Sequence, residues 1–160
     1  MAVEIERKFL LSNSRWRDQV YSKKTIVQGY LSQAPEKTVR IRISNERGII
    51  TIKGKSEGNS RLEFEYPIPL NDAKQLIKLC VQPVIEKQRH LVKHGTKTWE
   101  IDEFLGENKG LLLAEIELET SDEPIDLPEW IGREVSHDRR YFNASLATHP
   151  YCRWAEAEAH

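Results

Sequence analysis

Hydrophobic and polar side chains alternate with a period of two along most of this chain. The alternation is clear in VEIERKFL at residues 3–10, in TVRIRIS at 38–44 and in AEIELE at 114–119. Successive side chains of a β-strand point to opposite faces, so this period predicts strands rather than helices. The expected strands cover residues 3–11, 24–33, 37–45, 48–55, 60–69, 83–93, 97–105 and 111–120.

Turn-forming residues separate several of the predicted strands. They include Ala34-Pro35-Glu36, Glu46-Arg47-Gly48 and the segment 106–110, which begins and ends with glycine. Eight strands of this length predict a mostly β (α+β) fold with a mostly antiparallel sheet. A sheet of this size can close on itself as a barrel.

Three segments have helical character and are expected at the periphery of the sheet. Residues 71–80 begin with Asn71, a residue that caps helix N-termini, and carry apolar side chains at helical spacing. Residues 13–21 and 138–148 are weaker helix candidates. Because no repeat or linker interrupts the chain, residues 1–150 are expected to form one domain, followed by a loose C-terminal tail at 151–160.

Composition excludes several classes of protein. Net charge is only -1, from 24 basic and 25 acidic side chains, which argues against a general nucleic-acid binder. No apolar run approaches the roughly 20 residues that cross a bilayer, and the N-terminus has no secretion signal. The two cysteines, Cys80 and Cys152, have no metal-like spacing. A cytoplasmic protein without a nucleic-acid or membrane partner is expected.

The polar faces of the strands carry full charges that are sorted by sign. The basic positions on these faces include Lys8, Arg40, Arg42, Lys53, Lys87 and Arg89. The acidic positions include Glu4, Glu6, Glu63, Glu65, Glu100, Asp102, Glu115, Glu117 and Glu119.

Two interpretations of these faces are open. A sheet packed on one side has an ordinary solvated face, and alternation of this kind is what it needs. A closed barrel would instead place the charges in its lumen, with a cationic wall for a polyanion and an anionic wall for hard divalent cations. Solvated faces usually mix signs to gain cross-strand pairs, so the sorting strengthens the second interpretation without excluding the first.

The segment Glu4-Ile5-Glu6-Arg7-Lys8 resembles the E-x-E-x-K signature near the N-terminus of the triphosphate tunnel metalloenzymes, also called the CYTH superfamily. An ordered series of charged positions follows it, namely Arg40-x-Arg42, Lys53, the Glu63/Glu65 pair, Lys87-x-Arg89, Asp102 and Glu115-x-Glu117. The closing WIGREVSHDRRYFNASLA is similar to the C-terminal segment of that family, so the resemblance covers essentially the whole chain. It implies a closed eight-stranded antiparallel β-barrel, or tunnel.

The resemblance also implies a role for each inward charge. Carried over position by position, the phosphate-binding residues are Lys8, Arg40, Arg42, Lys53, Lys87 and Arg89. The residues that would hold Mg²⁺ or Mn²⁺, with two ions expected, are Glu4, Glu6, Glu63, Asp102, Glu115 and Glu117. The implied catalytic set is Glu4, Glu6, Lys8, Lys87 and Glu115. Second choices at the tunnel mouth are Glu65 and Glu119, no role is assigned to Arg133 or Arg139, and Arg7 points away from the tunnel.

The implied activity is metal-dependent hydrolysis of inorganic triphosphate, in which water attacks the terminal phosphorus. Among family members, the chain looks most like the small bacterial inorganic triphosphatases, because its 160 residues include no obvious insertion for a base or a thiazole. The alternatives are a class IV-type adenylate cyclase, a thiamine or nucleoside triphosphatase on the same fold, and a non-catalytic polyphosphate binder. The resemblance also suggests a homodimer.

A histidine pair offers a different metal site and is set aside. His90 and His94 lie four residues apart in a predicted strand, which separates them by about 13 Å along the chain. Both histidines are therefore expected to be exposed.

Overall fold

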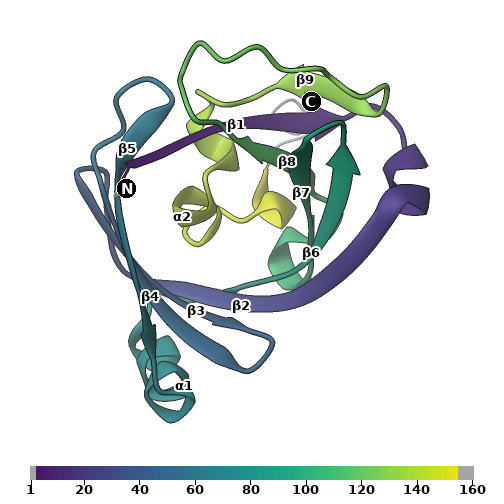
Figure 1. The fold of residues 1–160 in the computed structure, drawn as a ribbon. Coiled ribbons are helices and arrows are strands. Elements are labelled where there is room, and N and C mark those ends of the chain that lie inside the picture. Colours follow the sequence, from purple (N-terminus) through teal and green to yellow (C-terminus); the bar gives the residue numbers. More distant parts are fainter. Residues whose placement is uncertain (1–2, 155–160) are drawn as a thin grey trace.

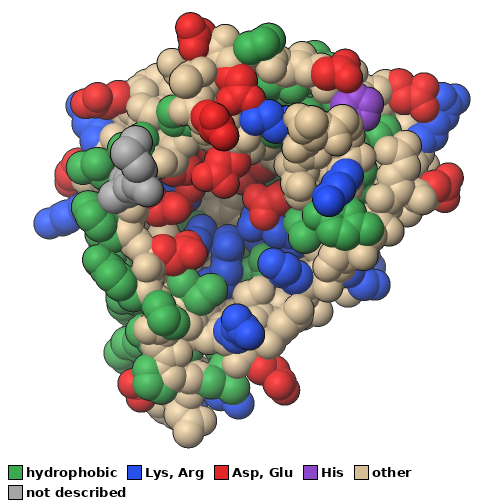
Figure 2. Space-filling model, viewed as in Figure 1, with side chains coloured by type: hydrophobic (Ala, Val, Ile, Leu, Met, Phe, Trp, Pro, Cys, Tyr) green, Lys and Arg blue, Asp and Glu red, His purple; other side chains and the backbone are tan. Residues whose placement is uncertain are grey.

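The strands form a barrel in the computed structural model, which describes residues 3–154 (Figure 1), and the space-filling view shows a hollow at its centre (Figure 2). The strands are β1 (Val3–Leu11), β2 (Val20–Ala34), β3 (Lys37–Ser44), β4 (Arg47–Gly54), β5 (Ser60–Ile68), β6 (Ile85–His94), β7 (Lys97–Phe104), β8 (Leu112–Glu117) and β9 (Ile131–Glu134). The helices are α1 (Leu70–Leu79) and α2 (Asn143–Leu146), with short 3₁₀ helices η1 (Arg15–Gln19), η2 (Gly106–Asn108), η3 (Arg139–Tyr141) and η4 (Tyr151–Arg153).

Pairing between the first and fifth strands closes the barrel. The sheet runs β5-β4-β3-β2-β6-β7-β8-β1, and β1 then pairs with β5 through Val3 opposite Leu62 and Ile5 opposite Ser60. All of these pairings are antiparallel. The predicted closed eight-stranded antiparallel barrel is therefore confirmed. Strand β9 lies outside the ring, on the far end of β1, where Phe9 pairs with Glu134.

Several boundaries differ from the predicted ones. Strand β2 begins at Val20 rather than residue 24, and β9 was not predicted at all. Helix α1 is present, but its N-cap is Pro69 and not Asn71, because the proline ends β5 and starts the helix at the next residue. The helix predicted over 138–148 is broken, because Phe142 adopts an extended backbone between η3 and α2.

The C-terminal segment fills one end of the barrel. Tyr30, Phe104 and Leu113 share the tunnel-facing side of their strands with the charged positions, and at this end they pack with Leu146 and Trp154 in one buried cluster. Figure 1 shows α2 inside the outline of the ring. Apolar burial of this kind stabilises the closed end and leaves the charged part of the tunnel as the accessible part.

Packing against the barrel continues beyond the expected end of the domain. Residues 151–153 form η4, and Trp154 is only 8% exposed, with its indole N–H donating to the His149 carbonyl. Residues 151–154 were assigned to a loose tail from the sequence, but Trp154 packs in the core, while Cys152 and Arg153 are exposed. The rest of that tail, residues 155–160, lies outside the described residues.

Two further apolar clusters cover the outside of the barrel. One contains Trp16, Trp99 and Trp130, each at most 1% exposed. The other lies under α1, where Ala73 packs against Ile41. Between residues 3 and 154, no helix combines the length and the apolar character required to cross a membrane.

Candidate active site

The tunnel wall divides into a cationic half and an anionic half, as Figure 2 shows. The cationic half consists of the adjacent strands β4, β3, β2 and β6, and the anionic half consists of β7, β8, β1 and β5. Five of the predicted cations are buried, each with no more than 8% of its surface exposed, namely Lys8, Arg40, Lys53, Lys87 and Arg89. A solvated sheet face would leave such side chains in water, so the structure favours the lumen interpretation.

Ion pairs form at the two boundaries between the cationic and anionic halves. At the boundary between β6 and β7, the ion pairs centre on Asp102. Its carboxylate accepts hydrogen bonds from Lys87 Nζ at 2.7 Å and from Arg89 Nε at 2.8 Å and Nη2 at 3.0 Å. Burial disfavours its charge, but the two cations outweigh burial and lower the pKa of Asp102 far below its usual value. Asp102 therefore stays ionised and fixes two phosphate-binding candidates.

Lys87 has a strongly perturbed ammonium group. It is 1% exposed, and burial lowers its pKa to about 7, with Arg89 and Arg42 adding to the effect and Asp102 opposing it. Burial and the neighbouring Arg40 and Arg89 also lower the pKa of Arg42, to about 9. The cationic half therefore holds more positive charge than the neighbouring carboxylates neutralise. A polyanionic ligand would supply the missing negative charge.

The second boundary lies between β4 and β5, where Lys53 of β4 contacts carboxylates of β5 and β1. Its ammonium donates to both carboxylate oxygens of Glu4, at 2.8 and 3.0 Å, and lies 3.4 Å from Glu63. Burial opposes the ionisation of Glu4, but the hydrogen bond from Glu63 and the charge of Lys53 lower its pKa to about 2. The same hydrogen bond raises the pKa of Glu63 to about 7, so the two carboxyl groups share a proton at neutral pH.

Carboxylates are crowded in the middle of the anionic half. Burial together with the charges of Glu115 and Glu4 raises the pKa of Glu6 to about 8. Glu115 is itself held ionised, with a pKa lowered to about 2, because the Lys8 ammonium 3.5 Å away outweighs its burial. A carboxyl group that keeps its proton at neutral pH indicates a site that lacks a cation.

Within the described part of the chain, Arg40 and Arg42 of β3 each donate one side-chain hydrogen bond to the protein, which leaves most of their N–H groups without a partner there. Arg40 Nη2 donates to Thr51 Oγ1 at 3.1 Å, while its buried Nε has no hydrogen-bond partner among the described residues. Arg42 donates through Nε to Gln28 Oε1 at 2.8 Å. A buried N–H donor without a partner costs free energy, which a bound phosphate would recover by accepting its hydrogen bond. The remaining N–H groups of both arginines are therefore suited to binding phosphate oxygens.

The remaining predicted positions lie at the margins of the tunnel or outside it. Glu117 pairs with Glu6 across β1 and β8 but is exposed, as are Glu65 and Glu119. The exposed residues of the C-terminal segment include Arg133 and Arg139. Arg7 points outward as expected, and its guanidinium donates to Glu134 on β9 at 2.6 and 2.9 Å.

No preformed cluster of three or more carboxylate, histidine or cysteine ligands occurs within residues 3–154. The acidic side chains instead pair with lysine and arginine or with one another. The chemistry of the set nevertheless fits a hard divalent cation, since it offers carboxylate oxygens and includes the protonated Glu6. Residues that could hold such an ion therefore lie together on one half of the tunnel.

Sequence reasoning missed two neutral side chains of the site. Gln28 of β2 is fully buried, and its Nε2 donates to Asn143 Oδ1 at 3.1 Å. Asn143 at the start of α2 also accepts from Lys87 Nζ at 2.9 Å. The parity of β2 could have placed Gln28 in the lumen, but nothing in the sequence indicates that α2 enters the barrel.

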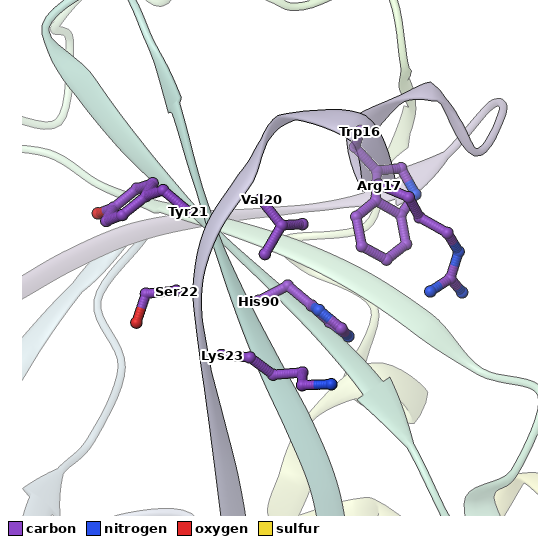
Figure 3. Close-up of a pocket in the computed structure, with 7 residues that line it drawn as sticks. All are labelled: Trp16, Arg17, Val20, Tyr21, Ser22, Lys23 and His90. Atoms are coloured by element: carbon purple, nitrogen blue, oxygen red, sulfur yellow. The ribbon is translucent and has the colours of Figure 1, made fainter.

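The histidine expectation is wrong for His90, which is only 6% exposed. It lies on the outside of the barrel, where the Trp16 ring covers it with centroids 5.1 Å apart and Glu103 contacts its Nε2 at 3.1 Å. A shallow depression beside this pair includes Tyr21 and Lys23 (Figure 3). None of the residues that line it belongs to the tunnel site.

Comparisons with known proteins agree with this geometry. A family model described as the CYTH domain matches residues 2–151. The chain is 45% identical over 158 residues to an inorganic triphosphatase of Acetivibrio thermocellus, covering 98% of this chain and 100% of that protein. It is 32% identical over 148 residues to an inorganic triphosphatase of Nitrosomonas europaea, covering 90% of this chain and 96% of that protein.

A solved structure supports the same grouping. The crystal structure of an inorganic triphosphatase superposes with a TM-score of 0.66 at 30% identity, covering 90% of this chain and 97% of that one. The match of the family model extends over nearly the whole chain, and the relatives are similar over nearly all of their length. The chain therefore belongs to the CYTH-domain family.

Proposed function

We propose that this protein is a metal-dependent inorganic triphosphatase that binds and hydrolyses its substrate inside the tunnel. The observation that carries the proposal is the enclosed lumen, where buried lysines and arginines face a set of carboxylates that is short of cations. The similarity to inorganic triphosphatases over nearly the full length supports the choice of substrate.

The cationic half would bind the triphosphate. Arg40 and Arg42 offer free guanidinium N–H groups that can grip two phosphate oxygens at once, and lysines supply compact charges. Lys53, Lys87, Arg89 and Lys8 complete the proposed phosphate-binding set. Fixed cations of this kind bind a ligand carrying about four negative charges near neutral pH without rearrangement of the barrel.

The anionic half would hold the metal ions. Glu6, Glu115 and Glu117 are the best placed, because they lie on the neighbouring strands β1 and β8 and Glu6 is protonated for lack of a cation. Glu4 and Glu63 lie beside these three residues and share a proton. Both belong to the proposed metal-binding set, and Lys53, which now bonds to Glu4, would have to turn towards phosphate to release them. When bound, Mg²⁺ or Mn²⁺ would neutralise phosphate charge and increase the acidity of a water molecule.

Asp102 has a different environment from the other proposed metal ligands. Its oxygens already accept three hydrogen bonds from Lys87 and Arg89. We therefore propose that it orients these two cations in the free protein, and its direct binding to metal stays a prediction.

The chemistry requires no covalent intermediate with the protein. Water attacks the terminal phosphorus in line, the bond from that phosphorus to the bridging oxygen breaks, and pyrophosphate leaves. Lys8 and Lys87 would stabilise the charge that develops on the terminal and bridging oxygens, since both ammonium groups are buried and fixed. Phosphate and pyrophosphate are the expected products.

Product analysis with three substrates tests the proposal. The protein is incubated with Mg²⁺ or Mn²⁺ and, separately, with tripolyphosphate, ATP and thiamine triphosphate, and phosphate, pyrophosphate and cyclic AMP are measured. Release of phosphate and pyrophosphate from tripolyphosphate, far faster than hydrolysis of ATP, is expected. Cyclic AMP would indicate a cyclase, faster hydrolysis of ATP or thiamine triphosphate would indicate another triphosphatase, and tight binding without turnover would indicate a polyphosphate binder.

A further inference from the structure

Two of the three buried lysines of the tunnel, Lys8 and Lys87, are held by the same C-terminal segment. Lys8 Nζ donates to the Tyr141 carbonyl at 3.2 Å, and Lys87 Nζ donates to Asn143 Oδ1 at 2.9 Å. Each lysine also faces one carboxylate, Glu115 in the first case and Asp102 in the second. Since an ammonium group has three N–H donors, each lysine keeps one donor for a ligand in the tunnel.

The amide of Asn143 has only one orientation that satisfies its neighbours. Arg42 has donors only, so the oxygen of Gln28 must face its Nε, and the NH₂ group of Gln28 then faces Asn143. The Lys87 ammonium is also a donor only, so both neighbours require the oxygen of Asn143 between them. Two side-chain amides thus connect Arg42 of β3 to Lys87 of β6 with their directions fixed.

We propose that Asn143 is a positioning residue for the triphosphatase reaction: its side-chain oxygen directs the Lys87 ammonium towards the substrate. With Asp102 and Asn143 occupying two donors, the third N–H of Lys87 has a fixed direction. Gln28 keeps the Asn143 oxygen in place through its own hydrogen bond. The inference rests on the proposed function, because it assigns Asn143 a role in that reaction.

A second hydrogen bond between the barrel and α2 offers a matched control. Gln33 of β2 donates through Nε2 to the Ala144 carbonyl at 2.8 Å, so it tethers α2 to the barrel without touching Lys87. Loss of this tether removes a contact between α2 and the barrel, as loss of the Asn143 side chain also does, but it leaves the contact with Lys87 in place. Gln33→Ala therefore separates a general loosening of the helix from a specific effect on Lys87.

Steady-state kinetics with tripolyphosphate and Mg²⁺ test the proposal in the full chain. Asn143→Ala is expected to lower kcat by about 10–100-fold, the range that a small misplacement of a reacting group costs, with KM changed by less than about threefold. Gln33→Ala should stay within about twofold of the wild type in kcat. In the double variant with Lys87→Met, Asn143→Ala should add less than about twofold, since its effect passes through Lys87.

Two results would overturn the proposal. One is an equal loss of kcat in Asn143→Ala and Gln33→Ala that follows their melting temperatures. The other is a full loss from Asn143→Ala in the Lys87→Met background. If the wild type hydrolyses no tripolyphosphate, the proposed function fails and the role of Asn143 in that reaction fails with it. The wild-type control distinguishes this result from the other two, in which the wild type is active.

Discussion

Lys8 and Glu115 face each other across strands β1 and β8, with Lys8 Nζ 3.5 Å from Glu115 Oε1 and both residues buried. Lys8 is thus the lysine that enters the anionic half of the tunnel. Burial opposes its charge, but Glu115 and Glu6 outweigh burial and raise its pKa. A cation held among carboxylates lies where phosphate and metal would meet.

Removal of this cation should reduce catalysis severely. Lys8→Ala is expected to lower kcat for tripolyphosphate by roughly 10²–10³, the scale observed when one preorganised charge stabiliser is lost. Glu115→Gln should have an effect of similar size. Arg7→Ala is the matched control, because Arg7 is the adjacent residue but bonds to Glu134 outside the barrel. Near-normal turnover in Lys8→Ala, or an equal loss in Arg7→Ala, would exclude this role.

Asp102 should contribute more to stability than any exposed carboxylate. Asp102→Asn removes the charge that compensates Lys87 and Arg89, so the free energy of unfolding should fall by roughly 3–5 kcal/mol. Glu103→Gln, one position away on the outer face, should cost less than about 1 kcal/mol because Glu103 and its partner Arg17 are both partly exposed. Urea denaturation in EDTA measures both values. Equal losses for the two variants would contradict the assigned role of Asp102.

The metal-free protein should lose stability as the pH rises from about 5 to 7. Glu6 and Glu63 have folded-state pKa values raised to about 8 and about 7, so the folded state binds more protons than the unfolded state above pH 4.5. Their contribution is complete below pH 4.5 and declines as the pH approaches those values. Above pH 7 the lowered pKa of Lys87 acts in the opposite direction, so the window below pH 7 is the clearest.

Glu6→Gln provides the control for this pH dependence. The variant has no titrating group at the position, so its free energy of unfolding should vary less with pH between 5 and 7 than that of the wild type. Thermal or urea unfolding at intervals of half a pH unit in EDTA gives the slopes. An identical slope in both proteins would show that Glu6 does not carry a shifted proton.

Metal and triphosphate together should stabilise the fold. At ligand concentrations of about 100 Kd, binding adds about 2.7 kcal/mol, which corresponds to roughly 5–10 °C in the melting temperature of a domain of this size. The shift should disappear in EDTA and shrink in Lys87→Met. A thermal-shift titration with both ligands that shows no change would contradict the tunnel site.

Much of the tunnel was predictable because a strand has a fixed period of two. Once Val3–Leu11 is recognised as a strand, Glu4, Glu6 and Lys8 must share one face, and Arg7 must lie on the other. The same rule places Arg40 with Arg42 and Lys87 with Arg89. Alternation does not reveal which strands are neighbours, so the pairing of Lys53 with Glu4 required the structure.

The closed end of the tunnel was not predictable from the same pattern. Gln28 carries no charge, and Asn143 lies in a segment whose predicted helix is broken at Phe142. Their contact joins residues 115 positions apart in the chain. Strand β9 was missed because its four residues are too few for alternation to stand out. Trp154 was assigned to a tail because the buried cluster that it joins includes Tyr30 and Leu113, which come from strands distant in the sequence.

A crystal structure with tripolyphosphate and Mn²⁺ tests the central claim most directly, because anomalous scattering locates the manganese. The phosphate oxygens should lie within hydrogen-bond distance of Arg40, Arg42 and Lys87, and manganese should lie beside Glu6 and Glu115. Triphosphate bound outside the tunnel, for example in the depression beside Trp16 and Lys23, or manganese away from the anionic half, would contradict the account.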